Sequence, residues 1–215
     1  MRINKFLALA TGHSRRAIDA LIQTGSVRVN GHVSAMGQDI KATDTVTIDN
    51  KPVKAPKITT SVLNKPVGYV CSRDGQGSQT VYNLLPEQYH HLKPVGRLDK
   101  YSSGLLLLTN DGDLAYQLTH PSFEKEKVYL VSVKPSLLAK DKQKIETGVQ
   151  LDDGISKLTL IKRGGKWQVI MHEGRNRQIR RTFAILNYKV IDLHRIKFGQ
   201  YKLEDLPSAT YKEIR

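Results

Sequence analysis

Apolar residues in the first part of the chain recur first at helical and then at strand spacing. On the first expected helix they fall at positions i, i+3, i+4 and i+7, namely Ile3, Phe6, Leu7 and Ala10. A second helix is expected to begin after Ser14, a good N-cap residue, and to end before Gly25. Apolar residues then alternate, and Asn30-Gly31 is typical of a two-residue hairpin turn. Residues 1–53 are therefore predicted to form a helix-helix-hairpin unit.

A change of pattern separates this unit from the rest of the chain. The stretch KPVKAPKIT has two prolines and three lysines without periodicity, which predicts a linker over residues 54–60. From residue 61 to 215, short apolar strands alternate with turn residues, and helical patterns occur near 113–119, 136–147 and 176–186. We predict an α+β domain there, with a mixed, mainly antiparallel sheet and flanking helices.

The net charge of the chain bears on what it binds. Lys and Arg number 34 against 20 Asp and Glu, which gives a formal net charge of +14. Such an excess indicates a polyanionic partner whose phosphates the cations would neutralise. A generally basic protein would show the same sum, so charge alone leaves both interpretations open.

Some classes of protein are disfavoured. Cys71 is the only cysteine, so an intrachain disulfide is impossible and a cysteine-based zinc site is not expected. His90, His91 and His120 lack metal-ligand spacing with acidic partners, so no other metal site is expected. No apolar run approaches the roughly 18 residues that span a bilayer. The basic start imitates a signal peptide in charge, but its apolar stretch is confined to residues 6–10. We therefore expect a cytoplasmic protein without membrane contact.

The helices of the N-terminal unit carry cations. A solvated helix face explains these charges as well as RNA does. The motifs are more specific, because SRR at 14–16 and GSVRVNG at 25–31 resemble the RNA-binding domain of the ribosomal protein S-four type. That resemblance implies binding of structured RNA through its shape and phosphates. The residues expected to make these contacts are Arg2, Lys5, Ser14, Arg15 and Arg16.

The segment PVGRLDKYSSGLLLLTNDGDLAYQL contains the first candidate for chemistry. In an extended backbone Arg97 and Asp99 share one face, with Leu98 on the other. A turn then leads to the apolar strand at 105–108. A carboxylate at the lip of a buried strand is held rigidly and partly desolvated, as a nucleophile requires. The alternative is an ordinary aspartate that caps a turn.

Two later segments bring further candidates. Tyr129 lies among aliphatic residues in KVYLVSV, where its ring would stack on a nucleobase or simply fill the core. A dense cluster of arginines follows, around a single apolar residue and at the start of a helix. Its members are Arg175, Arg177, Ile179, Arg180 and Arg181. Such a cluster indicates a polyanion or a partner carboxylate, the alternative being a solvated face.

Together these segments resemble the bacterial ribosomal-RNA pseudouridine synthases of the RsuA and RluB type. The matching motifs are GRLD with GLLLLTNDG, K-x-Y at 127–129 and EGRNRQIRR at 173–181. The resemblance implies that Asp99 is the nucleophilic or basic carboxylate and that Tyr129 packs on the target base. It further implies that Arg180 pairs with Asp99, that Ile179 forms an apolar wall, and that Arg97 helps to hold a flipped nucleotide.

The resemblance implies an enzyme that isomerises a uridine in ribosomal RNA as a monomer, without a cofactor. The arginines Arg175, Arg177 and Arg181 are then expected to contact the substrate RNA, with Arg175 on phosphate. A non-catalytic ribosome-assembly protein with two basic clamps is the alternative, although a pure binder gains nothing from a desolvated carboxylate. Hydrolysis of a nucleoside bond would also use Asp99, but calls for a second acid or a metal.

Overall fold

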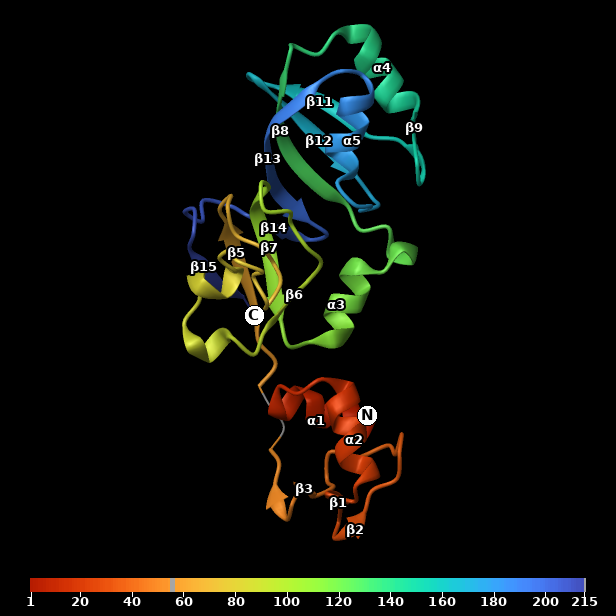
Figure 1. Ribbon diagram of the computed structural model, residues 1–215, viewed down its shortest axis with the longest axis vertical. Helices are drawn as coiled ribbons and strands as arrows, with labels where there is room; N and C mark the ends of the chain where they lie inside the picture. Colours follow the sequence, from red (N-terminus) through yellow and green to blue (C-terminus); the bar gives the residue numbers. More distant parts are fainter. Residues whose placement is uncertain (55–56, 215) are drawn as a thin grey trace. The chain divides into compact units, whose positions relative to one another are not determined.

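The structure is a computed structural model that describes residues 1–54 and 57–214. The chain divides into two compact units, Met1–Ile58 and Thr59–Arg215 (Figure 1). The linker expected over residues 54–60 lies partly outside the described residues.

The N-terminal unit packs two helices on a small sheet. Its elements are α1 (Ile3–Thr11), α2 (Arg15–Gln23), β1 (Val27–Val29), β2 (His32–Val33), β3 (Val46–Ile48) and β4 (Lys51–Pro52). The sheet order is β2-β1-β3-β4, and β1 pairs antiparallel with β2 across Asn30-Gly31. The hydroxyl of Ser14 accepts a hydrogen bond from the backbone N–H of Ala17 and so caps α2. Apolar residues of both helices and of β1 and β3 form one hydrophobic core, so this unit has a core of its own.

The second unit is built on a nine-stranded sheet with the order β11-β12-β8-β13-β7-β5-β15. Its main strands are β5 (Thr60–Lys65), β7 (Ser103–Thr109), β8 (Lys127–Lys134), β11 (Thr159–Arg163), β12 (Lys166–Met171), β13 (Lys189–Phe198) and β15 (Tyr211–Ile214). Short β14 (Tyr201–Lys202) and β6 (Lys93–Pro94) add to β13 and β7. Only the β7–β13 pairing is parallel among the described strands, so the mixed, mainly antiparallel sheet is confirmed.

Smaller elements flank this sheet. They are the helices α3 (Gly112–Thr119), α4 (Ala139–Thr147) and α5 (Gln178–Ile185), the hairpin strands β9 (Val149–Leu151) and β10 (Gly154–Ser156), and the 3-10 turns η1 (Val81–Leu84), η2 (Glu87–Tyr89) and η3 (Pro121–Phe123). Helix α5 packs against β13 and β9 (Figure 1). The three helices match the predicted ones in place. Helix α5 begins later than expected because Arg177 at its N-cap has a left-handed backbone with φ of 46°.

The run of four leucines in β7 is explained by burial on both faces of the sheet. Successive side chains of a strand point to opposite faces. Accordingly Leu106 and Leu108 belong to one apolar core, which includes Tyr129 and Ile179, whereas Leu105 and Leu107 belong to another. The strand that carries the Asp99 loop is therefore fixed from both sides.

Gly104 permits the parallel contact between β7 and β13. Its φ is +100°, and a Cβ atom there would lie 2.2 Å from the carbonyl oxygen of Arg195. Only glycine fits this approach without displacing backbone. The glycine after Ser102-Ser103 thus brings the Asp99 loop next to β13.

Candidate active site

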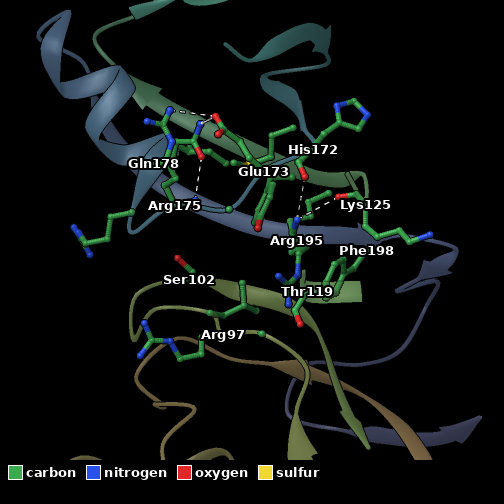
Figure 2. Close-up of a pocket in the computed structure, with 18 of the residues that line it drawn as sticks. Arg97, Ser102, Thr119, Lys125, His172, Glu173, Arg175, Gln178, Arg195 and Phe198 are labelled. Atoms are coloured by element: carbon green, nitrogen blue, oxygen red, sulfur yellow. Dashed lines mark hydrogen bonds and ion pairs between the residues drawn. The ribbon is translucent and has the colours of Figure 1, made fainter. Parts of the chain in front are cut away.

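A cavity of about 380 Å³ opens in the second unit. It is enclosed by the loop at 96–102, the end of α3 with the turn into β8, the loop between β12 and α5, and β13. Figure 2 shows Arg97 and Ser102 on one side of the cavity and Glu173, Arg175 and Gln178 on the opposite side. Segments far apart in the sequence therefore meet at one site.

The loop that carries Asp99 is held by a buried lysine. Lys65 at the end of β5 is 0% exposed, and its Nζ donates to the carbonyl oxygens of Pro66, Asp99 and Ser102 at 2.9, 3.2 and 2.7 Å. Burial lowers the pKa of Lys65 to about 8. The sequence analysis missed this residue; the signal was a lysine that directly follows the apolar strand in SVLNKP.

The carboxylate of Asp99 faces Arg177. The Arg177 Nη1 atom lies 3.8 Å from Asp99 Oδ2, and the two side chains are 47% and 35% exposed. Both residues line the cavity. Asp99 therefore keeps contact with solvent while a cation stands beside it.

The predicted ion pair between Arg180 and Asp99 is not formed among the described residues, which corrects the sequence interpretation. Arg180 instead donates to the carbonyl oxygens of Val190 and Tyr101 at 3.0 and 2.7 Å. It lies inside α5, so its side chain reaches the backbone of β13 and of the loop after Asp99, whereas Arg177 precedes the helix. Burial, above all, lowers the pKa of Arg180. Its guanidinium ties the helix to the loop.

Two apolar side chains line the cavity near this carboxylate. Tyr129 in β8 is 8% exposed and Ile179 in α5 is 4% exposed, and both belong to the large core as well. Arg97 lines the cavity with an exposed side chain. The structure thus brings Asp99, Tyr129, Arg97 and Ile179 together, as the sequence analysis expected.

The guanidinium groups of Arg175 and Arg181 are engaged within the protein. Arg175 lines the cavity but donates to Asp153, Gly154, Ile155 and Glu173. Arg181 donates to the carboxylate of Asp153 at 2.6 Å and is not a lining residue. The hydrogen bond from Arg181 lowers the pKa of Asp153. The Nη1 and Nη2 donors of Arg175 thus hold the turn between β9 and β10, and its expected phosphate contact stays a prediction.

The cations expected to bind RNA on the N-terminal unit differ in their surroundings. Arg15 and Arg16 are exposed on α2. Arg2 donates to the carbonyl oxygen of Gly37 and lies 3.4 Å from Asp39. Lys5 on α1 is half-buried. The exposed pair on α2 is thus the part of this set most open to a partner.

A metal-binding cluster and a membrane-spanning helix are both absent from the part of the chain that the structure describes. No three side chains of His, Cys, Asp or Glu gather in a way that would hold a metal ion. No helix in residues 1–54 or 57–214 is long and apolar enough to cross a bilayer.

The part of the chain that forms this cavity is similar to known proteins. The family model described as RNA pseudouridylate synthase matches residues 59–185, which contain Asp99, Tyr129 and Ile179. The second unit thus has the fold and sequence of an enzyme that isomerises uridine in RNA. The chain belongs to the RNA pseudouridylate synthase family.

Individual relatives match nearly the whole chain. An uncharacterized RNA pseudouridine synthase of Aquifex aeolicus is 36% identical over 224 residues, covering 100% of this chain and 90% of that protein. The ribosomal large subunit pseudouridine synthase B of Bacillus subtilis is 33% identical over 223 residues, covering 99% and 91%. A crystal structure of a pseudouridylate synthase superposes with a TM-score of 0.70 at 29% identity, covering 100% of this chain and 96% of that one.

Proposed function

We propose that this protein isomerises a specific uridine of ribosomal RNA to pseudouridine, with Asp99 as the reacting carboxylate. The observation that carries the proposal is Asp99 at the lip of a cavity walled by Tyr129 and Ile179. Relatives named as ribosomal large subunit pseudouridine synthases support ribosomal RNA as the substrate.

The reaction needs few groups, and its atoms balance without a redox partner. The bond between C1′ of the ribose and N1 of uracil breaks, the base rotates, and a bond from C1′ to C5 forms. C5 then loses its proton and N1 gains one. Asp99 either attacks the sugar or base, or removes a sugar proton. Tyr129 packs on the base and takes part in proton transfer. The guanidinium of Arg177 faces the carboxylate and keeps it oriented.

The size of the cavity favours a nucleotide that has left the helical stack. About 380 Å³ is at the lower end of the range for small-molecule pockets, enough for a nucleoside and far too small for a duplex. Unstacking is cheapest at loops and bulges, so the target uridine belongs in an irregular region of the RNA. Arg97, exposed at the rim, contacts the flipped nucleotide.

The N-terminal unit supplies affinity rather than chemistry. Arg2, Lys5, Ser14, Arg15 and Arg16 contact phosphates of structured or partly assembled ribosomal RNA, as in the S-four type of domain. The protein acts as a monomer in the cytoplasm, where this RNA is made.

Mapping pseudouridines in ribosomal RNA tests the proposal. Cells that lack the protein should miss one or a few pseudouridines, and these should return when the wild-type chain is supplied but not when the supplied chain carries Asp99→Asn. A complete set of pseudouridines together with accumulated ribosomal precursors would instead support the non-catalytic assembly protein.

A further inference from the structure

A buried arginine and a half-buried lysine in the cavity have no role in the chemistry described so far. Arg195 in β13 is 2% exposed; its Nε donates to the carbonyl oxygen of Leu105 at 2.7 Å, and its buried Nη2 has no hydrogen-bond partner among the described residues. The Nζ of Lys127 at the start of β8 donates only at 3.2 and 3.5 Å, to the carbonyl oxygens of Lys125 and His172. Both side chains line the cavity.

These cations flank Tyr129 on its own face of the sheet. Arg195 is the direct cross-strand partner of Tyr129 in the antiparallel pairing of β13 with β8. Directly opposed residues project to the same face, and so do residues two apart along one strand, which places Lys127 there as well. Figure 2 shows Arg195 beside Phe198 and Thr119 in the wall of the cavity. A base packed on Tyr129 would therefore lie next to both cations.

Neither cation forms an ion pair with a carboxylate in the described part of the chain. Among the described residues neither Arg195 nor Lys127 has an Asp or Glu oxygen within 4.0 Å. The ring of Phe198 lies under both, 4.9 Å from Arg195 Cζ and 5.2 Å from Lys127 Nζ, which offsets part of the cost of burial. Burial and the nearby Arg195 lower the pKa of Lys127, against a weaker opposing effect of Glu173. A buried arginine beside a half-buried lysine, neither with a carboxylate in ion-pair contact in the described part of the chain, indicates that the occupant of the cavity brings negative charge.

We propose that Arg195 and Lys127 bind the uracil ring through its carbonyl oxygens and stabilise the negative charge that the ring carries while it is detached from the ribose. The inference rests on the proposed function. When the bond from C1′ to N1 breaks, its electron pair stays on uracil and spreads to O2 and O4. When C5 bonds to C1′, that pair is used and the ring becomes neutral after transfer of the C5 proton. Charge that exists only between these steps is what preorganised cations stabilise best.

The burial of Arg195 favours the base over a phosphate as its ligand. A flipped nucleotide enters base first, while its phosphates remain with the RNA backbone at the rim. Arg195 lies almost entirely out of solvent, whereas Arg97 and Lys125 line the cavity with more exposed side chains. Arg195 is thus placed where the ring arrives, and the more exposed cations are placed where phosphates pass.

The test compares uridine with 5-fluorouridine at the target position of the RNA. Fluorine withdraws charge from the ring, so cleavage of the fluorinated nucleotide depends less on the cations. We expect Lys127→Met and Arg195→Lys to slow cleavage of the base-to-ribose bond in single-turnover assays by about a hundredfold with uridine, and by distinctly less with 5-fluorouridine. Lys189→Met, an exposed lysine in β13, is the matched control and should behave as wild type. Equal slowing of both substrates would overturn the proposal. The proposal would also be overturned if the two variants bound RNA more weakly, with a smaller salt dependence of binding, but kept the wild-type cleavage rate. That result would mean that the two cations contact phosphate.

A second measurement needs no RNA. Fluorine NMR of free 5-fluorouracil, titrated with the full chain at pH values below and above the ionisation of the ligand, reports binding of the neutral and the anionic ring. We expect the wild-type protein and Lys189→Met to bind the anion more tightly than the neutral ring, and Lys127→Met to lose this preference. A wild-type protein without the preference overturns the inference, whatever its activity on RNA. A wild-type protein that has the preference but makes no pseudouridine contradicts the proposed function instead.

Discussion

The Nη1 atom of Arg177 lies 3.8 Å from Oδ2 of Asp99, at the point where helix α5 begins. Since both side chains are partly exposed, this ion pair contributes little to folding, of the order of 0–1 kcal/mol. We expect its main effect on the proposed reaction, because a flipped nucleotide would exclude water and strengthen the attraction. Arg180, three residues later, is committed to two backbone carbonyls.

Replacing Arg177 and replacing Arg180 should therefore have different effects on rate and stability. We expect Arg177→Ala to lower the single-turnover rate by about tenfold or more, with the free energy of unfolding changed by less than about 1 kcal/mol. Single-turnover assays at saturating enzyme and urea denaturation measure the two effects separately.

For Arg180→Ala we expect a loss of stability first. Removing the guanidinium deletes its hydrogen bonds to the carbonyl oxygens of Tyr101 and Val190, at a cost of about 0.5–1.5 kcal/mol each. A wild-type unfolding midpoint for this variant, together with a large loss of rate, would restore the pairing of Arg180 with Asp99 that the sequence suggested.

Asp99→Asn should abolish isomerisation while RNA binding stays within about twofold of wild type. The substitution removes a charge and leaves size and the Lys65 contact to the backbone oxygen unchanged. Replacing an essential nucleophile typically lowers the reaction rate by several orders of magnitude, roughly 10⁴-fold or more. Pseudouridine quantification after single-turnover reaction measures the loss, and residual activity within tenfold of wild type would contradict the assignment.

Gly104→Ala tests whether the approach of β7 to β13 positions the site. The added Cβ would lie 2.2 Å from the carbonyl oxygen of Arg195, at a φ of +100°. We expect insoluble protein or a loss of more than about 3 kcal/mol in the free energy of unfolding. Gly165→Ala is the control, since no atom lies within 4 Å of its added Cβ, and should change stability by no more than about 0.5 kcal/mol.

Much of the fold could be predicted because periodicity reports burial. The spacing of Ile3 and Leu7 indicated α1, and the unbroken leucines of β7 indicated a buried strand, which the structure shows to be covered on both faces. The start of α5 was placed too early because the backbone at Arg177 is left-handed, which the local pattern does not reveal. The single parallel pairing of β7 with β13 is a long-range contact that no local motif encodes.

The candidate site was predictable at the level of motifs and less so at the level of contacts. The segments around Asp99, Tyr129 and Ile179 do line one cavity. The hydrogen-bond partners of Arg175, Arg180 and Arg181 could not be predicted from the sequence. The direction of each side chain depends on where α5 begins and on the distant turn at Asp153. Arg195 could not be predicted as a site residue, because an isolated arginine in a strand has no distinctive sequence pattern.

Lys65 makes stability depend on pH in an unusual direction. Burial lowers its pKa from 10.5 to about 8 in the folded chain. Between these values the unfolded chain binds a proton that the folded chain does not, so this group makes stability rise with pH. Below pH 8 both states are protonated, and the cost of burying the ammonium is present in full.

We therefore expect wild type to gain stability relative to Lys65→Met as pH rises. The gain should be about 2 kcal/mol between pH 7 and pH 9.5, on top of a constant offset from the three lost hydrogen bonds. Urea denaturation of both proteins at several pH values measures this difference, and comparison with the variant cancels the other groups that titrate in the same window. The exposed lysine Lys93 supplies the control, because the difference between wild type and Lys93→Met should stay flat. If the difference for Lys65→Met is also flat, the ammonium of Lys65 keeps its ordinary pKa, and the Asp99 loop is held by a cation that folding does not desolvate.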